Sequence, residues 1–298
     1  MSPSADFDPR AAFGRRRFLA LGAGIALSGA LAACGGKSGS GVLDGLDGDL
    51  QVVSRFPADA LTPGTQRLAL SLADKSGVLT TDGKVTLPTS LRATVSSPVT
   101  GDVLLSNLTA TRHDENLAVP YWLFEFELDE AGLYLLTLDV APEAPASFQL
   151  MDPKLVPMPT PGSPLPPFDT PTMADARGVN PICTRSEGPC PFHETTLTEA
   201  LASGKRVAYL IGTPAHCTTG TCGPALEALI EVARELSDTW AFVHAEVYAD
   251  KNANTIAPAV KAYKLTYEPI LYLTDAEGTL VRRLDVVFDA KELRDALA

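Results

Sequence analysis

The chain has 298 residues, of which 45% are hydrophobic and 20% are charged, a balance typical of a soluble globular protein with room for two domains. Its formal net charge of −12 argues against nucleic acid or an anionic membrane surface as a binding partner.

The first 33 residues have the pattern of an export signal. Residues 15–19 read RRRFL and lead into a Gly/Ala-rich apolar run that ends at Ala33. This run is shorter than the roughly 20 residues that a helix needs to span a bilayer, which favours a signal peptide over a stable anchor helix. The arrangement resembles a twin-arginine signal, which directs folded proteins to export.

A cysteine follows the apolar run directly. Residues 31–34 read LAAC, which resembles the bacterial lipobox. The resemblance implies cleavage before Cys34 and attachment of acyl chains such as palmitate to its thiol, with residues 34–50 as a flexible tether. An ordinary signal peptide with a chance cysteine is the alternative. We therefore expect a lipoprotein anchored on the extracytoplasmic side of the cell membrane.

Residues 51–152 predict a domain made of strands. Seven short segments rich in Val, Leu, Thr and aromatic residues are separated by Pro, Gly, Asp and Ser, namely residues 51–56, 66–74, 91–97, 102–110, 121–129, 132–140 and 146–152. This spacing suggests a β-sandwich, and the turn before Tyr134 resembles the tyrosine corner of immunoglobulin-like domains. The segment holds no cysteine. We expect His113 to be a solvated loop residue.

A proline-rich linker is expected at residues 153–180. Eight prolines lie between residues 153 and 171, a density that favours extended polyproline II structure and a semi-rigid spacer. Recognition by a proline-binding partner and packing along one of the domains are alternatives.

From Thr196 onward the pattern alternates between helix and strand. Helices are predicted at residues 196–204, 224–238, 255–265 and 290–298, and strands at residues 206–212, 241–248, 269–275 and 279–286. After the first helix, the order β-α-β-α-β-β-α predicts parallel pairing first and an antiparallel hairpin at the end.

That order resembles thioredoxin over about residues 195–298. Cys222-Gly223-Pro224 matches the first three residues of the family's C-G-P-C motif, and Pro269 falls where the family keeps a cis-proline beside the active-site sulfurs. The expected fold class is therefore multi-domain, with an all-β immunoglobulin-like sandwich at residues 51–152 before an α/β thioredoxin-like domain at residues 181–298. The resemblance implies a redox pair, Cys217 and Cys222, with Pro269 beside it.

The sequence also departs from that family. Ala225 occupies the position of the resolving cysteine, the partner Cys217 lies upstream of the helix, and His216 replaces the usual Trp. The strand at residues 206–212 carries no buried acid that could move a proton. We expect Cys222, which lies nearer the helix dipole, to be the more acidic thiol.

Cys183 and Cys190 form the second close pair. Apart from Cys34, the chain has four cysteines, and an even number in an oxidising compartment predicts disulfides. Their Pro/Gly-rich loop favours a structural disulfide. A relay with Cys217 and Cys222, or a metal site with His193, is the alternative, and His244 is expected to be an ordinary strand residue.

The leading functional hypothesis is a membrane-anchored thiol–disulfide oxidoreductase without a cofactor. Its partners would be exported thiol or disulfide proteins, or a membrane electron-transfer protein. Two alternatives remain open. One is a non-catalytic binding lipoprotein whose disulfides are structural, and the other is a copper-binding chaperone with His216 or His193 as weak candidate ligands.

Overall fold

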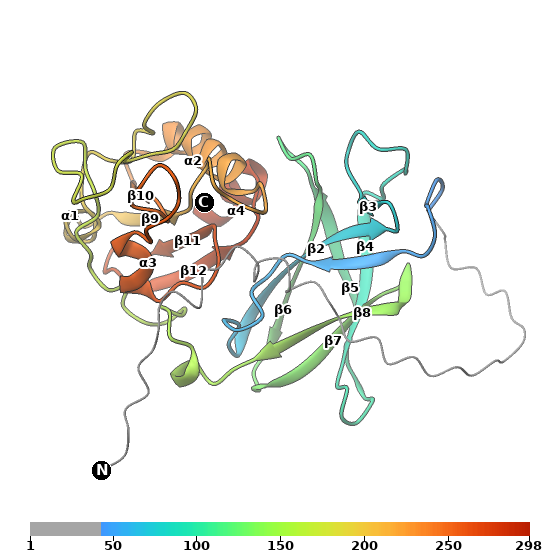
Figure 1. Cartoon of the computed structure of the whole chain (residues 1–298). Helices are drawn as coiled ribbons and strands as arrows, with labels where there is room; N and C mark the ends of the chain where they lie inside the picture. Colours follow the sequence, from blue (N-terminus) through green and yellow to red (C-terminus); the bar gives the residue numbers. More distant parts are fainter. Residues whose placement is uncertain (1–42) are drawn as a thin grey trace, which may run out of the picture. The chain divides into compact units, whose positions relative to one another are not determined.

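The computed structural model describes residues 43–298, so the expected signal peptide at residues 1–33 and the expected lipidation site Cys34 lie outside the described residues. Val42–Ala298 form one compact unit that holds two β-sheets (Figure 1). None of the helices in the described part of the chain is long and apolar enough to cross a membrane.

The first sheet is antiparallel throughout and takes in every strand before residue 151. Its strand order is β1-β2-β6-β5-β4-β7-β8, with the short β3 paired to β2. The bounds are β1 Gln51–Ser54, β2 Gly64–Asp74, β3 Gly77–Val78, β4 Ser90–Ser96, β5 Val103–His113, β6 Tyr121–Leu128, β7 Gly132–Leu138 and β8 Ala141–Leu150. All seven strands predicted from the sequence are present, and only β3 was not predicted.

This sheet encloses its own hydrophobic core. Alternate residues of β6 point inward, so Trp122, Phe124 and Phe126 are buried while Glu125 and Glu127 are exposed. They pack against Phe148 and against leucines of β2 and β7. These leucines are Leu68, Leu70, Leu72, Leu136 and Leu138.

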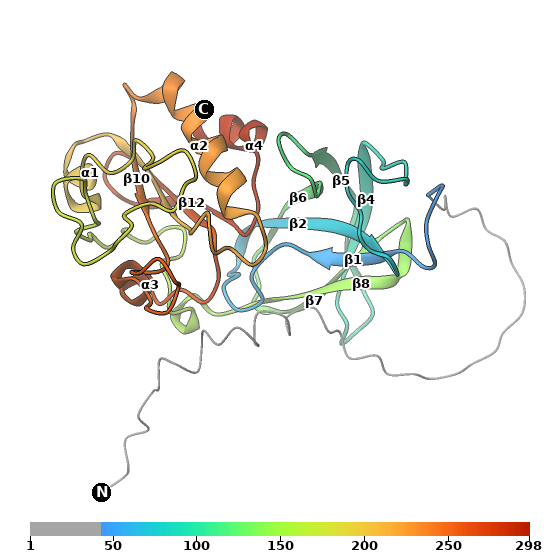
Figure 2. The same cartoon turned by 45° about the horizontal axis from the view of Figure 1, so that its top comes forward.

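The predicted immunoglobulin-like sandwich is wrong. One continuous sheet runs from β1 to β8 and curls into a nearly closed barrel-like form, instead of two sheets packed face to face (Figure 2). Register shifts in β4 near Val95 and in β7 near Leu136 are bulges, which bend a strand and increase its twist. β4 pairs with β5 on one side and with β7 on the other within the same sheet.

The second sheet has four strands in the order β10-β9-β11-β12. β9 (Arg206–Ile211) pairs parallel with β10 (Trp240–Ala245), whereas β11 (Ile270–Thr274) pairs antiparallel with β9 and with β12 (Leu280–Asp285). The helices are α1 (Leu197–Ala202), α2 (Cys222–Leu236), α3 (Pro258–Tyr263) and α4 (Ala290–Leu297), with a short 3-10 turn, η2, at Pro153–Leu155.

The predicted thioredoxin-like α/β class is also contradicted. The individual helices and strands lie where the sequence predicts them. However, the described part of the chain is mostly β with only 15% helix, and no thioredoxin α/β pattern is evident in it. The physical reason is the shortness of the helices. α1 and α3 have 6 residues each and α4 has 8, so α2, with 15, is the only long one in the described chain. Long irregular segments take the remaining space.

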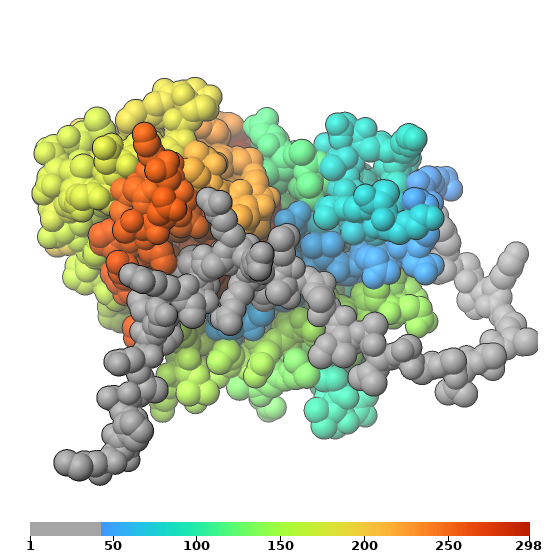
Figure 3. Space-filling view, viewed as in Figure 1, coloured from blue at the N-terminus to red at the C-terminus, as the bar shows by residue number. Residues whose placement is uncertain are grey.

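The proline-rich segment packs against the second sheet. Gly162 N–H donates to Leu280 O at 2.8 Å, and Leu280 N–H donates to Ser163 O at 2.9 Å, so the segment satisfies the outer edge of β12. Leu165 nearby is buried. Figure 3 shows yellow-green residues, which follow β8, at the surface beside orange residues of the second half of the chain. Residues 153–180 are thus part of the folded unit and not a free spacer.

Buried polar groups join the two sheets. The Arg67 guanidinium on β2 contacts both carboxylate oxygens of Glu292 on α4, at 2.5 and 2.7 Å, and Tyr121 donates to the same carboxylate. His113, which the sequence predicts in a solvated loop, is buried at the end of β5 and lies 2.9 Å from Asp289. The prediction for His113 is therefore wrong, because this residue is buried in a contact between the two parts of the structure.

Candidate redox site and a neighbouring cluster of cysteine and histidine

Cys217 and Cys222 lie where β9 leads into α2. Cys217 is in the connecting loop, and α2 begins at Cys222, whose backbone N–H donates to the Cys217 sulfur at 3.3 Å. All four cysteines within residues 43–298 are free thiols. The two sulfurs and a carboxylate oxygen of Glu268 lie within 4.8 Å of one another.

Cys217 is the more acidic and the more accessible thiol of the pair. It is half-buried, whereas Cys222 is only 1% exposed. A hydrogen bond from the Cys222 thiol, with further ones from Thr219 and from the backbone N–H groups of Thr221 and Cys222, lowers the pKa of Cys217 to about 5. A thiolate at this position is both nucleophilic and a good leaving group.

The expectation that Cys222 is the more acidic thiol is therefore wrong. Burial, together with the hydrogen bond to Cys217 and the nearby charge of Glu268, raises the pKa of Cys222 well above its ordinary value. Proximity to the helix N-terminus stabilises a thiolate, but desolvation acts on the same group in the opposite sense and outweighs it here.

Glu268 supplies a buried carboxyl group beside the two sulfurs. Its Oε2 lies 3.3 Å from Cys222 Sγ and accepts the Thr213 backbone N–H at 2.7 Å. Burial and the charge of Cys217 raise the pKa of Glu268 to about 8. The buried acid that is missing from β9 is thus present at Glu268, two residues before β11, where the sequence did not predict it. The available signal was a Glu directly before the proline already assigned to the site.

Pro269 closes the other side of the site. The expected cis bond, Glu268–Pro269, is present. A Cβ added at Gly212 would lie 3.3 Å from Pro269 Cβ and 3.6 Å from Cys222 Sγ. Gly212 therefore lets the end of β9 approach both residues.

A surface cleft of about 680 Å³ opens beside the cysteine loop. Its wall includes Pro214 and Ala215 from that loop and Gly223 and Pro224 from the first turn of α2. Charged residues of both signs complete the lining, namely Arg185, Glu187, Glu227, Glu231 and Arg234.

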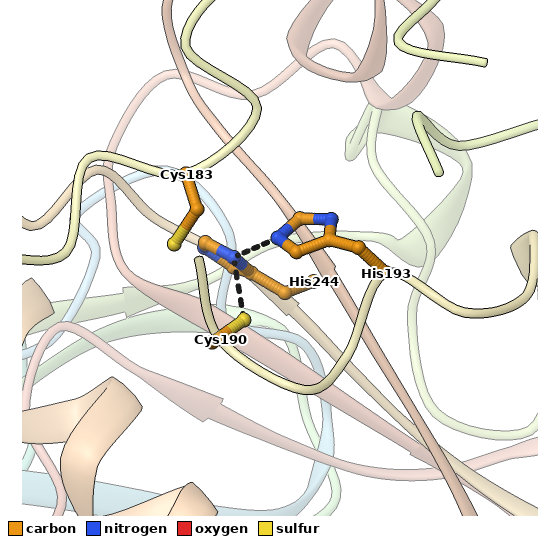
Figure 4. Close-up of side chains that lie close together, drawn as sticks. All are labelled: Cys183, Cys190, His193 and His244. Atoms are coloured by element: carbon orange, nitrogen blue, oxygen red, sulfur yellow. Dashed lines mark hydrogen bonds between the residues drawn. The ribbon is translucent and has the colours of Figure 1, made fainter. Parts of the chain in front are cut away.

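The second cysteine pair lies in a separate cluster with two histidines. One nitrogen or sulfur from each of Cys183, Cys190, His193 and His244 lies within 4.8 Å of the others, and all four residues are buried (Figure 4). His244 projects from β10, and the other three come from the irregular segment before α1. His244 Nδ1 is 3.4 Å from Cys190 Sγ and 3.2 Å from His193 Nε2.

The predicted structural disulfide between Cys183 and Cys190 is not formed in this structure, where both residues are thiols facing imidazole nitrogens. His193, a weak candidate ligand in the sequence, is part of this cluster, and His244, assigned there to an ordinary strand position, is part of it too. His216 lies apart from it and contacts the Tyr248 ring edge-on, at 6.0 Å between centroids.

Comparisons with known proteins add no family to this description. No family model and no curated protein matches the chain. A solved structure, the native conformation of E. coli alpha-2-macroglobulin, matches with a TM-score of 0.24 and 17% identity over 44% of this chain. The match covers 8% of that protein, and a likeness of this size carries no argument about fold or function.

Proposed function

We propose that the protein is a thiol–disulfide oxidoreductase in which Cys217 attacks and Cys222 resolves. The observation that carries the proposal is the arrangement of an accessible thiol, a buried thiol and a buried carboxyl group within 4.8 Å. The proposal rests on these side chains alone and not on a fold family.

The first step is attack by the Cys217 thiolate on one sulfur of a substrate disulfide. A bond forms between Cys217 Sγ and that sulfur, the substrate S–S bond breaks, and the leaving thiolate takes a proton from water. A pKa near 5 keeps Cys217 largely ionised at neutral pH. Its partial exposure allows a substrate to reach it.

The second step releases the substrate. Once Cys217 is in a mixed disulfide its negative charge is gone, so one cause of the raised Glu268 pKa disappears. The Glu268 carboxyl can then release its own proton to water, and the resulting carboxylate accepts the Cys222 proton across the existing 3.3 Å contact. Cys222 Sγ attacks Cys217 Sγ, the bond from Cys217 to the substrate breaks, and the second substrate thiolate leaves and takes a proton from water. The enzyme pair is now a disulfide, and the two electrons that its thiols lost are held by the reduced substrate. A dithiol reductant or a membrane electron-transfer partner restores the pair.

We further propose that this exchange takes place on exported proteins at the extracytoplasmic face of a membrane. Support comes from the twin-arginine pattern at residues 15–19 and the lipobox pattern that ends at Cys34.

Trapping the covalent intermediate tests the function. The reduced full chain is mixed with a peptide disulfide that carries a mass tag. Cys222→Ser should accumulate the peptide on Cys217, because the resolving thiol is missing. Cys217→Ser is the matched control and should accumulate none. Absence of an adduct in Cys222→Ser, or an adduct on another cysteine, would sink the assignment. Copper held by Cys217 and Cys222 in the purified protein would favour a metal chaperone instead.

A further inference from the structure

We propose that Cys183, Cys190, His193 and His244 form a closed, tetrahedral zinc site. These residues are distinct from the pair proposed for disulfide exchange, so the inference stands or falls independently of that function.

The spacing of the donor atoms suits one zinc ion. With Zn–N of about 2.0 Å and Zn–S of about 2.3 Å, tetrahedral geometry puts two nitrogens about 3.3 Å apart and a nitrogen and a sulfur about 3.5 Å apart. The observed separations are 3.2 Å between His193 Nε2 and His244 Nδ1, and 3.4 Å between His244 Nδ1 and Cys190 Sγ. Cys183 Sγ lies within 4.8 Å of the other three donors.

Hydrogen bonds on the outer side of each ring orient both histidines as ligands. His244 Nε2 lies 3.0 Å from Gly212 O, and His193 Nδ1 lies 3.4 Å from Pro171 O. A carbonyl oxygen only accepts, so each of these nitrogens carries the ring proton in the neutral imidazole. The lone pairs of His193 Nε2 and His244 Nδ1 therefore face one another across 3.2 Å, an arrangement that a shared cation stabilises. Backbone carbonyls commonly orient metal-binding imidazoles in this way.

Burial and charge favour Zn²⁺ over other ions. Each of the four residues is at most 5% exposed, so no position is left open to water, as in structural zinc sites. Two thiolates and two neutral imidazoles balance the charge of one divalent ion, which a buried site requires. Tetrahedral S₂N₂ coordination is typical of zinc, whereas carboxylate and water ligands suit magnesium and calcium.

The site would fix an irregular segment to the second sheet. Cys183, Cys190 and His193 lie outside helices and strands, and His244 lies on β10. Thr184, next to Cys183, accepts the Ala215 backbone N–H at 3.1 Å, which ties this segment to the loop that carries Cys217. A metal-bound segment would therefore also order the wall of the neighbouring cleft.

Metal analysis of the wild-type full chain, purified without chelator, is the direct test. We expect inductively coupled plasma mass spectrometry to measure about one zinc ion per chain. Replacement of zinc with cobalt should produce the visible absorption bands of a tetrahedral, thiolate-bound ion. A chain that holds no zinc and takes up neither ion after full reduction overturns the proposal. So does copper or iron bound at these residues in place of zinc.

Variants assign the ligands. Cys183→Ser, Cys190→Ser and His244→Gln should each weaken zinc binding at least ~10-fold. Cys217→Ser and His216→Gln are matched controls and should keep one ion per chain. The opposite pattern, with zinc lost in Cys217→Ser and kept in Cys183→Ser, overturns the assignment. Because a ligand variant can fail to fold, cobalt spectroscopy of the wild type reports the S₂N₂ donor set independently.

Discussion

The Cys222 sulfur lies 3.3 Å from a carboxyl oxygen of Glu268, and both groups are buried. The two residues are 46 positions apart in the chain and meet because α2 begins, and β11 is entered, at the same end of the second sheet. The hydrogen-bond contacts of the Glu268 carboxyl in the described structure are with the Cys222 sulfur and the Thr213 N–H. We infer that Glu268 moves the Cys222 proton.

Glu268→Gln should slow the resolving step about 10²-fold, because the amide cannot accept the Cys222 proton. Attack by Cys217 should change much less, so the mixed disulfide should accumulate transiently. Rapid quenching with acid, followed by mass spectrometry, measures the two steps separately. Glu277→Gln, the same substitution at an exposed position, is the control. Equal slowing of both steps would show that Glu268 only supports the local structure.

The acidity of Cys217 predicts a pH profile for its alkylation. The rate of reaction of Cys217 with iodoacetamide in the reduced, folded chain should rise with pH through an inflection near 5, against 9.0 for an ordinary cysteine. The thiolate is the reactive form, and it predominates above the pKa. Peptide mapping separates Cys217 from Cys222, whose thiol should react slowly because it is buried.

Cys222→Ala tests the cause of that acidity. The Cys222 thiol is the largest cause of the lowered Cys217 pKa, so its removal should move the inflection upward. Cys222→Ser keeps a hydroxyl donor and should move it less. An inflection of the wild type near 9, or identical profiles for the two variants, would contradict this explanation.

Local sequence patterns account for most of the helices and strands. Alternation in β6 and the apolar stripe of α2 depend on neighbours in the chain, and both elements lie where they are predicted. The fold class does not follow from these patterns. Whether the strands form two sheets or one curled sheet depends on which strands pair with each other. Periodicity within a single strand carries no sign of this pairing, nor of the register shifts near Val95 and Leu136.

The candidate sites show the same limit. Cys217, Cys222 and Pro269 were found because they resemble a known motif, whereas Glu268 needed the loop before β11 to be placed beside α2. His244 reaches Cys190 across 54 residues, so ligand spacing along the chain could not reveal the cluster. Burial reversed the relative acidity of the two thiols, and burial of a single cysteine is a tertiary property.

The buried ion pair between Arg67 and Glu292 is expected to contribute to the free energy of unfolding. Their side chains are 9% and 3% exposed and share a bidentate contact. Arg67→Met removes one charge and leaves the Glu292 carboxylate buried without its partner. The free energy of unfolding should fall by about 3–5 kcal/mol, measured as a lower midpoint in urea.

Two further variants test whether the effect of Arg67→Met comes from the buried, unpaired charge. Lys75→Met breaks the exposed ion pair with Asp47 and should change the midpoint little, because solvent screens that pair. Adding Glu292→Leu to Arg67→Met removes the uncompensated charge and should restore part of the lost stability. Equal midpoints for Arg67→Met and Lys75→Met would show that the buried pair contributes no more to stability than a surface pair.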